Sequence, residues 1–307
     1  MIKVGAPICD EARRDHNGRV SMGVSRARLP VKFMLIVGAC LMLLCAALAF
    51  QIFAEARGAS APQILLPELS EDAKSVFSKS GVVIDHGNSS QGYVMVKYKE
   101  SDRRLKVRIT LDKKNYDYDL NGKGEYEVFP LQMGDGKYKI TVFQEKKKNE
   151  YANLASTTIT VKLDRSIMPF LYPNQYVHYT AASKAVAKSF ELCEGLTDDK
   201  DKIKAIYNFC TRQISHNFVF ANSAKSGYLP DVDAVLGKKT GICFDYAALM
   251  ACMLRVQGIP TQLVIGYADR SYHAWNNVLV DGKWYRFDAT SVSASITASN
   301  YREERHY

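Results

Sequence analysis

The spacing of apolar residues changes between residues 161 and 181, and that change constrains the fold more than any other feature. Between residues 92 and 161 apolar residues recur at every second position, most regularly in residues 105–111, which read LKVRITL. From residue 181 onward the spacing becomes three or four, as in Val186, Phe190 and Cys193. A period of two is that of a half-buried strand, and a period near 3.6 is that of a helix. The chain is therefore predicted to hold an all-β region followed by a region that begins with helices.

The β region is predicted to be an independent sandwich. Strands are expected at residues 92–98, 105–111, 138–143 and 157–161, with turn signals at 121–122 (Asn-Gly) and 134–136 (Gly-Asp-Gly). Short alternating strands separated by such turns are typical of an antiparallel, immunoglobulin-like β-sandwich, which we place at residues 70–165. The basic run at residues 146–149 is interpreted as a solvated loop.

A proline-containing segment separates the two regions. Pro169 and Pro173 interrupt regular structure in residues 165–175, so a second domain is assigned to residues 166–307. Its first helices are expected from residue 181, from Thr197-Asp198, and over residues 231–236. The apolar stripes of these helices are interpreted as core packing. The overall prediction is an α+β domain preceded by an all-β one.

The N-terminal residues predict attachment to a membrane. Residues 33–53 form an uncharged apolar run, and residues 1–32 before it carry seven basic and three acidic side chains. This length and charge asymmetry predict a basic cytoplasmic tail, a single-span transmembrane anchor and an extracellular remainder, with residues 54–69 as a spacer. The alternative is a signal peptide cleaved near residues 54–61, which would give a secreted protein.

Composition argues against several classes of function. The net charge is +9, of which the tail supplies 7 − 3 = +4, and the other basic residues are interleaved with acids. A nucleic-acid partner is therefore not predicted. Cysteines outside the tail and the apolar run are Cys193, Cys210, Cys243 and Cys252, in no metal-binding spacing, so no metal and no cofactor are expected. Cys193 and Cys210 either form a disulfide or, the interpretation we favour, are buried thiols. The oligomeric state stays open.

Cys243 differs from the other cysteines in its local setting. Gly241 breaks the chain just before a run of strong helix formers at residues 247–254, and Gly258-Ile259-Pro260 ends that run. Cys243 is thus predicted at a helix N-terminus, where unpaired N–H groups and the helix dipole favour a thiolate. Cys252 lies on the same helix among apolar neighbours and is interpreted as a core residue.

A predicted hairpin brings a histidine and an aspartate together. A strand at residues 261–267 is followed by a strand that starts at His273, an Asp281-Gly282 turn, and a return strand that ends at Asp288. The count places His273 and Asp288 nearly opposite, so the carboxylate can orient the imidazole. Trp275 is expected on the face of His273, as core packing. Each residue alone has a plain structural interpretation; their joint placement predicts a Cys243–His273–Asp288 site for nucleophilic acyl chemistry.

Several motifs in this region resemble one known family. Residues 241–247 (GICFDYA), 272–275 (YHAW) and 288–290 (DAT), together with 227–236 and 258–260, resemble exported bacterial members of the transglutaminase-like superfamily. This family is related in fold to papain-like cysteine proteases, and the resemblance covers about residues 165–300. It implies an α+β core in which the nucleophile helix packs on an antiparallel sheet. It also implies Cys243 as nucleophile, His273 as general base and acid, and Asp288 as the residue that orients His273.

Two hypotheses about function follow. In the first, a membrane-anchored extracellular cysteine enzyme acts on protein or cell-wall peptide amides through a thioester, by acyl transfer or hydrolysis. The backbone N–H of Cys243 is expected to bind the oxyanion, and Tyr228 is either a second donor or a packing aromatic. In the second, the site is catalytically silent and the chain is a cell-surface adaptor. Members of the family include cross-linkers, proteases or amidases, and inactive binding modules.

Overall fold

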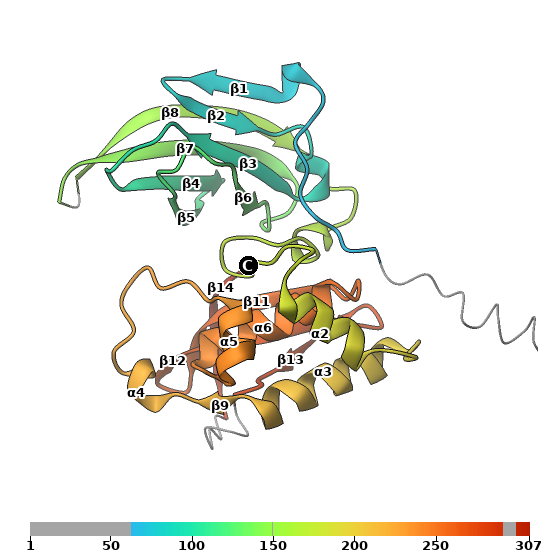
Figure 1. Cartoon of the computed structure of the whole chain (residues 1–307). Helices are drawn as coiled ribbons and strands as arrows, with labels where there is room; N and C mark the ends of the chain where they lie inside the picture. The colour runs from blue at the N-terminus through green and yellow to red at the C-terminus, as the bar shows by residue number, and fades with distance from the viewer. Residues whose placement is uncertain (1–62, 149, 291–298) are drawn as a thin grey trace, which may run out of the picture. The chain divides into compact units, whose positions relative to one another are not determined.

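The computed structural model describes residues 63–148, 150–290 and 299–307 (Figure 1). The predicted tail, the apolar run at residues 33–53 and the start of the spacer lie outside these ranges. Within them, no helix is both long enough and apolar enough to cross a membrane. The strands are β1 (Val76–Lys79), β2 (Val82–Asp85), β3 (Tyr93–Tyr98), β4 (Leu105–Leu111), β5 (Lys114–Leu120), β6 (Glu127–Pro130), β7 (Gly136–Lys147), β8 (Glu150–Val161), β9 (Ser215–His216), β10 (Thr240–Gly241), β11 (Thr261–Ala268), β12 (Ser271–Val280), β13 (Lys283–Phe287) and β14 (Tyr301–His306). The helices are α2 (Lys184–Leu192), α3 (Asp199–Gln213), α4 (Phe218–Ala221), α5 (Val232–Lys238) and α6 (Cys243–Arg255), with short 3₁₀ turns at Ala73–Ser75, Ser89–Gln91 and Met168–Phe170.

The N-terminal part of the described chain consists of two antiparallel sheets. One has the strand order β1-β2-β3-β6 and the other β5-β4-β7-β8 (Figure 1). Residues 105–111 form β4 as predicted, and its four apolar side chains are buried while Lys106, Arg108 and Thr110 are not. The strands predicted at 92–98, 138–143 and 157–161 correspond to β3 and to parts of β7 and β8.

The hydroxyl of Tyr138, near the start of β7, holds the chain segment that leads into that strand. It lies 3.1 Å from the carbonyl oxygen of Leu131 and 2.7 Å from that of Gly134, and the backbone N–H of Met133 donates to it at 3.1 Å. The side chain is fully buried, so these bonds satisfy a hydroxyl that has lost its water. The contacts fix the approach of residues 131–136 to the sheet.

The proline-containing segment packs closely on β3 and its preceding turn. Gly92 has φ +86°, and a Cβ atom there would lie 2.7 Å from the backbone nitrogen of Pro169. Only glycine allows this approach at that conformation. Pro169 is itself buried in the 3₁₀ turn Met168–Phe170. The two prolines therefore mark a packed connection between the β-sheets and the following helices.

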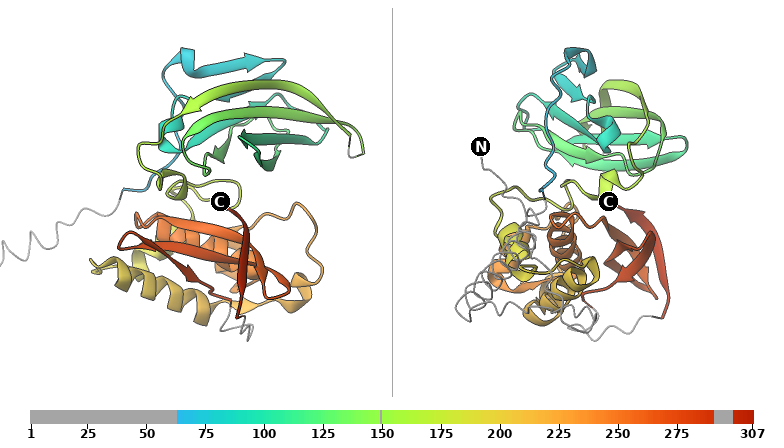
Figure 2. Two further views of the ribbon diagram at one scale, coloured as in Figure 1. Left: turned by 180° about the vertical axis from the view of Figure 1, so that it is seen from behind. Right: turned by 90° about the vertical axis from the view of Figure 1, so that its right-hand side faces the viewer.

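The C-terminal part is an α+β arrangement centred on α6. Its main sheet has the strand order β13-β12-β11-β14, every pair antiparallel, and β9 pairs with β10 in parallel. Helix α6 packs against β11 and β12 on one side and against α2, α3 and α5 on others, as the separate helical and sheet layers of Figure 2 show. Every residue of α6 from Asp245 to Arg255 is buried, which its almost uniformly apolar sequence explains.

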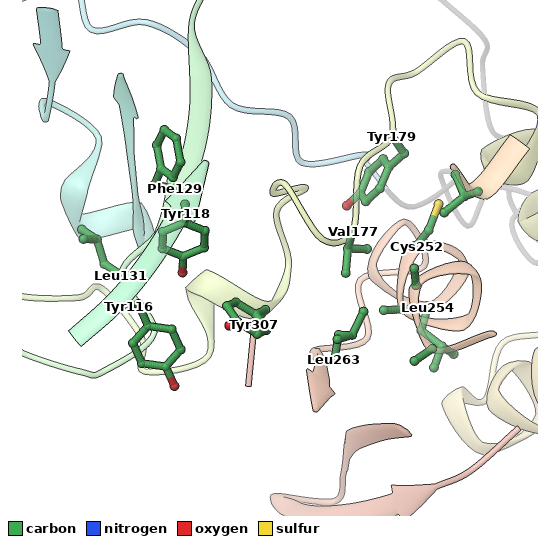
Figure 3. Close-up of a cluster of buried hydrophobic side chains, with 14 of the residues drawn as sticks. Tyr116, Tyr118, Phe129, Leu131, Val177, Tyr179, Cys252, Leu254, Leu263 and Tyr307 are labelled. Carbon is green, nitrogen blue, oxygen red and sulfur yellow. The ribbon is translucent and has the colours of Figure 1, made fainter. Parts of the chain in front are cut away.

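Tyr307, the last described residue, follows β14 and belongs to a shared aromatic cluster. The backbone N–H and C=O of Tyr307 both bond to Leu263, at 2.8 and 2.9 Å. Its ring meets Tyr116 and Tyr118 edge-on at 5.5 and 5.9 Å (Figure 3). It also stacks on Tyr176 at 4.0 Å. One hydrophobic cluster thus includes side chains of the β-sheets and of the α+β part.

A buried arginine ties α6 to the segments around it. Arg255 is 1% exposed, and its guanidinium donates to the backbone carbonyls of Tyr172, Thr261 and Tyr307 at 2.7 to 3.0 Å. Burial lowers the pKa of Arg255 to about 10, which leaves it charged at neutral pH. The carbonyl oxygens therefore solvate the cation in place of water.

Candidate active site

Cys243 is the first residue of α6, as the sequence predicted. Gly241 in β10 and the extended Ile242 lead into the helix, so the thiol lies beside the free N–H groups of its first turn. Cys243 is half-buried, whereas Cys193, Cys210 and Cys252 are buried, and all four are free thiols. Burial raises the pKa of each of those three, that of Cys210 to about 12. The favoured interpretation of Cys193 and Cys210 as buried thiols is confirmed.

The entry to α6 is held by a carboxylate. Asp245 is 1% exposed, and its two oxygens accept from the backbone N–H of Ile242 at 2.9 Å and from the Tyr228 hydroxyl at 2.6 Å. Burial raises the pKa of Asp245, although these two bonds work against that rise. Gly241 is required here because a Cβ atom would stand 2.7 Å from the Cβ of Asp245. The arrangement fixes the backbone immediately before Cys243.

Tyr228 has the role of a packed, hydrogen-bonded aromatic in this geometry. Its hydroxyl donates to Asp245, and its ring meets Phe220 at 5.0 Å and Phe244 at 6.4 Å, both edge-on. Of the two interpretations left open by the sequence, packing is the one these contacts favour. No structural observation links the Tyr228 hydroxyl to the thiol.

His273 is hydrogen-bonded to Asp288, and the Cys243 thiol interacts with the same ring. The distance from Nε2 to the Asp288 Oδ2 is 2.9 Å. Burial alone would lower the pKa of His273, since the ring is only 4% exposed. The bonds to Asp288 and Cys243 and their charges outweigh burial and raise the pKa to about 9. At neutral pH the ring is therefore an imidazolium.

Asp288 reaches His273 diagonally across the hairpin. The strand register pairs Asn276 with Phe287 and is centred on the Asp281-Gly282 turn, so its continuation places Asp288 opposite Trp275. His273 and Asp288 are therefore offset by two residues, as the sequence count about the turn gave, and a carboxylate can reach such a diagonal neighbour. Asp288 Oδ1 accepts from the backbone N–H of Thr290 at 3.0 Å. Burial would raise the pKa of Asp288, but the bond to His273 and its charge lower it overall.

Tyr301 completes the surroundings of Asp288. Its hydroxyl donates to Asp288 Oδ2 at 2.7 Å, and its ring lies edge-on to Trp275 at 5.1 Å and beneath the guanidinium of Arg286 at 3.8 Å. Trp275 is stacked with His273 at 6.4 Å, which confirms that the two share a face. Tyr301 was not found from the sequence, because β14 lacks an apolar alternation and follows residues 291–298.

A second candidate residue, His216, also escaped the sequence reasoning. It lies in β9, directly opposite Gly241 in the parallel pair with β10. Its charge state is coupled to that of His273, since the His273 charge helps to lower the pKa of His216 after burial. A lone histidine in a two-residue strand carries no signal of its own, so only the fold could reveal this proximity.

The site combines three groups in an order suited to acyl chemistry. A half-exposed thiol at a helix N-terminus contacts an imidazolium, and a buried carboxylate contacts the same ring. Such a neighbourhood stabilises a thiolate, and the imidazolium can donate a proton to a leaving group. The fold is α+β, with the helix that begins at Cys243 packed on an antiparallel sheet and with His273 and Asp288 near its start.

Comparison with known proteins shows which family this part of the chain is similar to. Residues 186–289 match the model of the Transglutaminase-like superfamily. The matched segment includes Cys243, His273 and Asp288. The α+β transglutaminase-like core that the sequence predicted is thereby confirmed.

The individual relatives are more distant. Two curated relatives are the kyphoscoliosis peptidases of Homo sapiens, 27% identical over 133 residues, and of Mus musculus, 26% identical over 118 residues. These alignments cover 38% and 34% of this chain but only 20% and 18% of the relatives, so the chain spans about a fifth of their length. Among solved structures, the periplasmic domain of TgpA from Pseudomonas aeruginosa is similar at 17% identity and a TM-score of 0.35, covering 75% of this chain and 77% of that one. The red sea bream transglutaminase is similar at 13% identity and a TM-score of 0.27, covering 68% and 49%.

Proposed function

We propose that this protein is a cysteine enzyme that cleaves or transfers carboxamide groups of proteins or peptides through a thioester on Cys243. The observation that carries the proposal is the continuous contact from thiol to imidazole to carboxylate at the start of α6. Membership of residues 186–289 in the transglutaminase-like superfamily supports the same class of reaction.

The proposed first half-reaction forms the thioester. The Cys243 thiolate attacks the carboxamide carbon, and the carbonyl π electrons move to the oxygen. When this oxyanion collapses, the C–N bond breaks and the His273 imidazolium gives its proton to the leaving ammonia or amine. A pKa of about 9 keeps His273 protonated and ready for this donation at neutral pH. Asp288, held by Tyr301 and Thr290, keeps the ring oriented throughout.

The proposed second half-reaction resolves the thioester. An amine or a water molecule attacks the thioester carbon and gives a proton to neutral His273, and the thiolate leaves. The backbone N–H of Cys243, in the first turn of α6, is our candidate for binding the oxyanion in both halves. Both acceptors are kept in the proposal, because the contacts around the thiol are compatible with either.

A single mass-spectrometric experiment tests this function. The purified full chain is incubated with a glutamine-containing peptide, with and without a primary amine. Amine incorporation adds the mass of the amine less ammonia, hydrolysis converts amide to acid, and backbone cleavage yields two fragments. The Cys243→Ala variant should lose every one of these products, and Cys252→Ala is the matched control in a thiol that is buried and remote from the imidazole. Equal products from wild type and Cys243→Ala would refute the proposal.

We also propose that the enzyme is anchored in a membrane by residues 33–53 and faces the extracellular side. The support is the uncharged length of this run and the basic tail before it. A protease added to intact cells should degrade residues 54–307 while the tail stays protected. Protection of the C-terminal domains as well would contradict this orientation.

The β-domain is proposed to be immunoglobulin-like. Support comes from the strand orders β1-β2-β3-β6 and β5-β4-β7-β8 and from Tyr138, whose hydroxyl bonds back to the carbonyls of Leu131 and Gly134. In such domains a tyrosine near the start of a late strand bonds back to the backbone a few residues upstream. We expect Tyr138→Phe to lower the free energy of unfolding by about 1–3 kcal/mol in urea titrations. A loss within the error of the titration would argue against this role.

A further inference from the structure

His216 lies next to the proposed reaction centre, and its imidazole has no evident structural role among the described residues. Strand β9 runs parallel to β10 and places His216 opposite Gly241, two residues before the nucleophile. The backbone N–H of Asn217 donates to the Gly241 carbonyl at 2.9 Å, which fixes this placement. The ring meets Phe218 at 4.5 Å and Tyr246 on α6 at 6.5 Å. The imidazole is therefore held in position by its backbone and by two aromatic rings.

One ring nitrogen of His216 has no hydrogen-bond partner among the described residues. This nitrogen, Nδ1, is buried. An unpaired nitrogen in a half-buried ring costs free energy, commonly about 1–3 kcal/mol, unless something else uses it. A side chain that is held in place while a ring nitrogen has no hydrogen-bond partner in the described residues is suited to bind a group that arrives with the substrate.

The charge state of His216 complements that of His273. Burial, and then the positive charge of His273, lower the pKa of His216 below its usual value. At neutral pH the site therefore holds one imidazolium, His273, and one neutral imidazole, His216. The first is suited to donate a proton and the second to accept one.

We propose that His216 is a further catalytic residue, which accepts a proton from an incoming alkylammonium acceptor so that the free amine can attack the Cys243 thioester. The inference rests on the proposed function and makes amine transfer, rather than hydrolysis alone, a reaction of this site.

The proton balance requires two acceptors for such a substrate. A primary alkylammonium must lose one proton before its nitrogen has a lone pair, and a second proton as the C–N bond forms and the C–S bond breaks. His216 takes the first and neutral His273 takes the second, which restores the imidazolium beside the thiolate. His216 then releases its proton to water. A water acceptor needs only one base during attack, so His216 is not required for hydrolysis.

The neighbouring helix offers a surface for the carbon chain of the acceptor. Helix α4 begins two residues after His216, and its Phe218 and Val219 are 58% and 81% exposed. Exposed apolar side chains next to the imidazole fit the methylene stem of a lysine or a diamine. The ring contact between His216 and Phe218 would bring the stem and the ammonium group to adjacent positions.

Two acceptors of different charge test the proposal. Cadaverine is an ammonium ion at neutral pH, whereas hydroxylamine is largely uncharged and needs no prior deprotonation. The full chain is given a glutamine peptide with either acceptor at pH 7, and product is quantified as cadaverine adduct or hydroxamate. We expect His216→Gln to lower the ratio of cadaverine transfer to hydroxamate formation at least about tenfold. His178→Gln, the same change at an exposed histidine, should leave the ratio unchanged.

A second variant and the controls separate the remaining outcomes. Phe218→Ser, which retains both histidines, should raise the KM for cadaverine about threefold or more relative to that for hydroxylamine. An equal fall of both products in His216→Gln, or no fall, would overturn the role of His216. Wild type that forms Cys243-dependent hydroxamate but no cadaverine adduct would also overturn it and would leave the proposed function standing. Hydroxamate formed equally by Cys243→Ala would refute both.

Discussion

Replacing Asp288 by asparagine tests the charge balance of the site most directly. In the fold the pKa of His273 is about 9, against 6.5 for an ordinary histidine. The difference of about 2.5 pKa units corresponds to roughly 3.4 kcal/mol in favour of the protonated ring, at about 1.36 kcal/mol per unit. Burial acts against this preference, so the contributions of Asp288 and Cys243 together exceed it.

Asparagine keeps a polar group near Nε2 but removes the negative charge. Because the carboxylate is one of two groups that raise the pKa of His273, we expect Asp288→Asn to lower that pKa by roughly 1–2 units. The rate of thioester formation depends on the imidazolium, so its decline at high pH should move from about pH 9 toward pH 7–8. Single-turnover acylation with a labelled glutamine peptide, measured from pH 5 to 10, gives this limb. The His273 ring proton, followed by NMR, gives the pKa independently.

The same hairpin supplies a matched control. Asp281 is exposed in the turn between β12 and β13, and its positive φ of 49° is one that asparagine also tolerates. Asp281→Asn should therefore leave the high-pH limb unchanged. If the high-pH decline of the acylation rate stayed at its wild-type position in a folded Asp288→Asn protein, the assignment of the raised His273 pKa to Asp288 would be wrong.

Three further outcomes are expected. Tyr301→Phe removes the 2.7 Å bond to Asp288 and should raise the pKa of that carboxyl and cost about 0.5–1.5 kcal/mol of unfolding free energy, measured in urea. Gly241→Ala should destabilise the fold and lower acylation, since its Cβ would meet Asp245, whereas Gly237→Ala, with no atom within 4 Å, should be neutral or stabilising in thermal melts. The pKa of His273 is higher in the folded protein than in the unfolded chain, so protonation of this ring stabilises the fold. That contribution is complete below about pH 6.5 and is lost as the pH rises through about 9. His273→Gln should therefore flatten the dependence of stability on pH in this range.

Local sequence patterns were sufficient to predict those elements whose structure depends on a short segment alone. Alternation in residues 105–111 predicted β4 residue for residue, because each apolar side chain of that strand faces the core. A glycine followed by helix-forming residues predicted the start of α6 at Cys243, and Asp198 and Asp231 cap α3 and α5 as their sequences suggested. In these cases short-range energetics and burial favour the same structure.

Long-range pairing was not accessible in the same way. Strand β14 is mostly polar and exposed, and it joins the sheet beside β11 rather than beside its sequence neighbour β13. Its register with β11 also contains an irregularity between Ile265 and Gly266. Nothing in the periodicity of such an edge strand distinguishes it from a loop. Tyr301 could be assigned to Asp288 only after the sheet order was known.

The two histidines show why a reactive trio is easier to find in sequence than its surroundings. Cys243, His273 and Asp288 lie within two local units, a helix start and a hairpin, whose geometry follows from short segments. His216 reaches the same site through the two-residue parallel pairing of β9 with β10, two strands that α4 and α5 separate along the chain. The choice of acceptor is proposed to depend on this second kind of residue. Chains with the same trio can therefore differ in whether water or an amine completes the reaction, and the residue opposite the glycine before the nucleophile is where that difference should be sought.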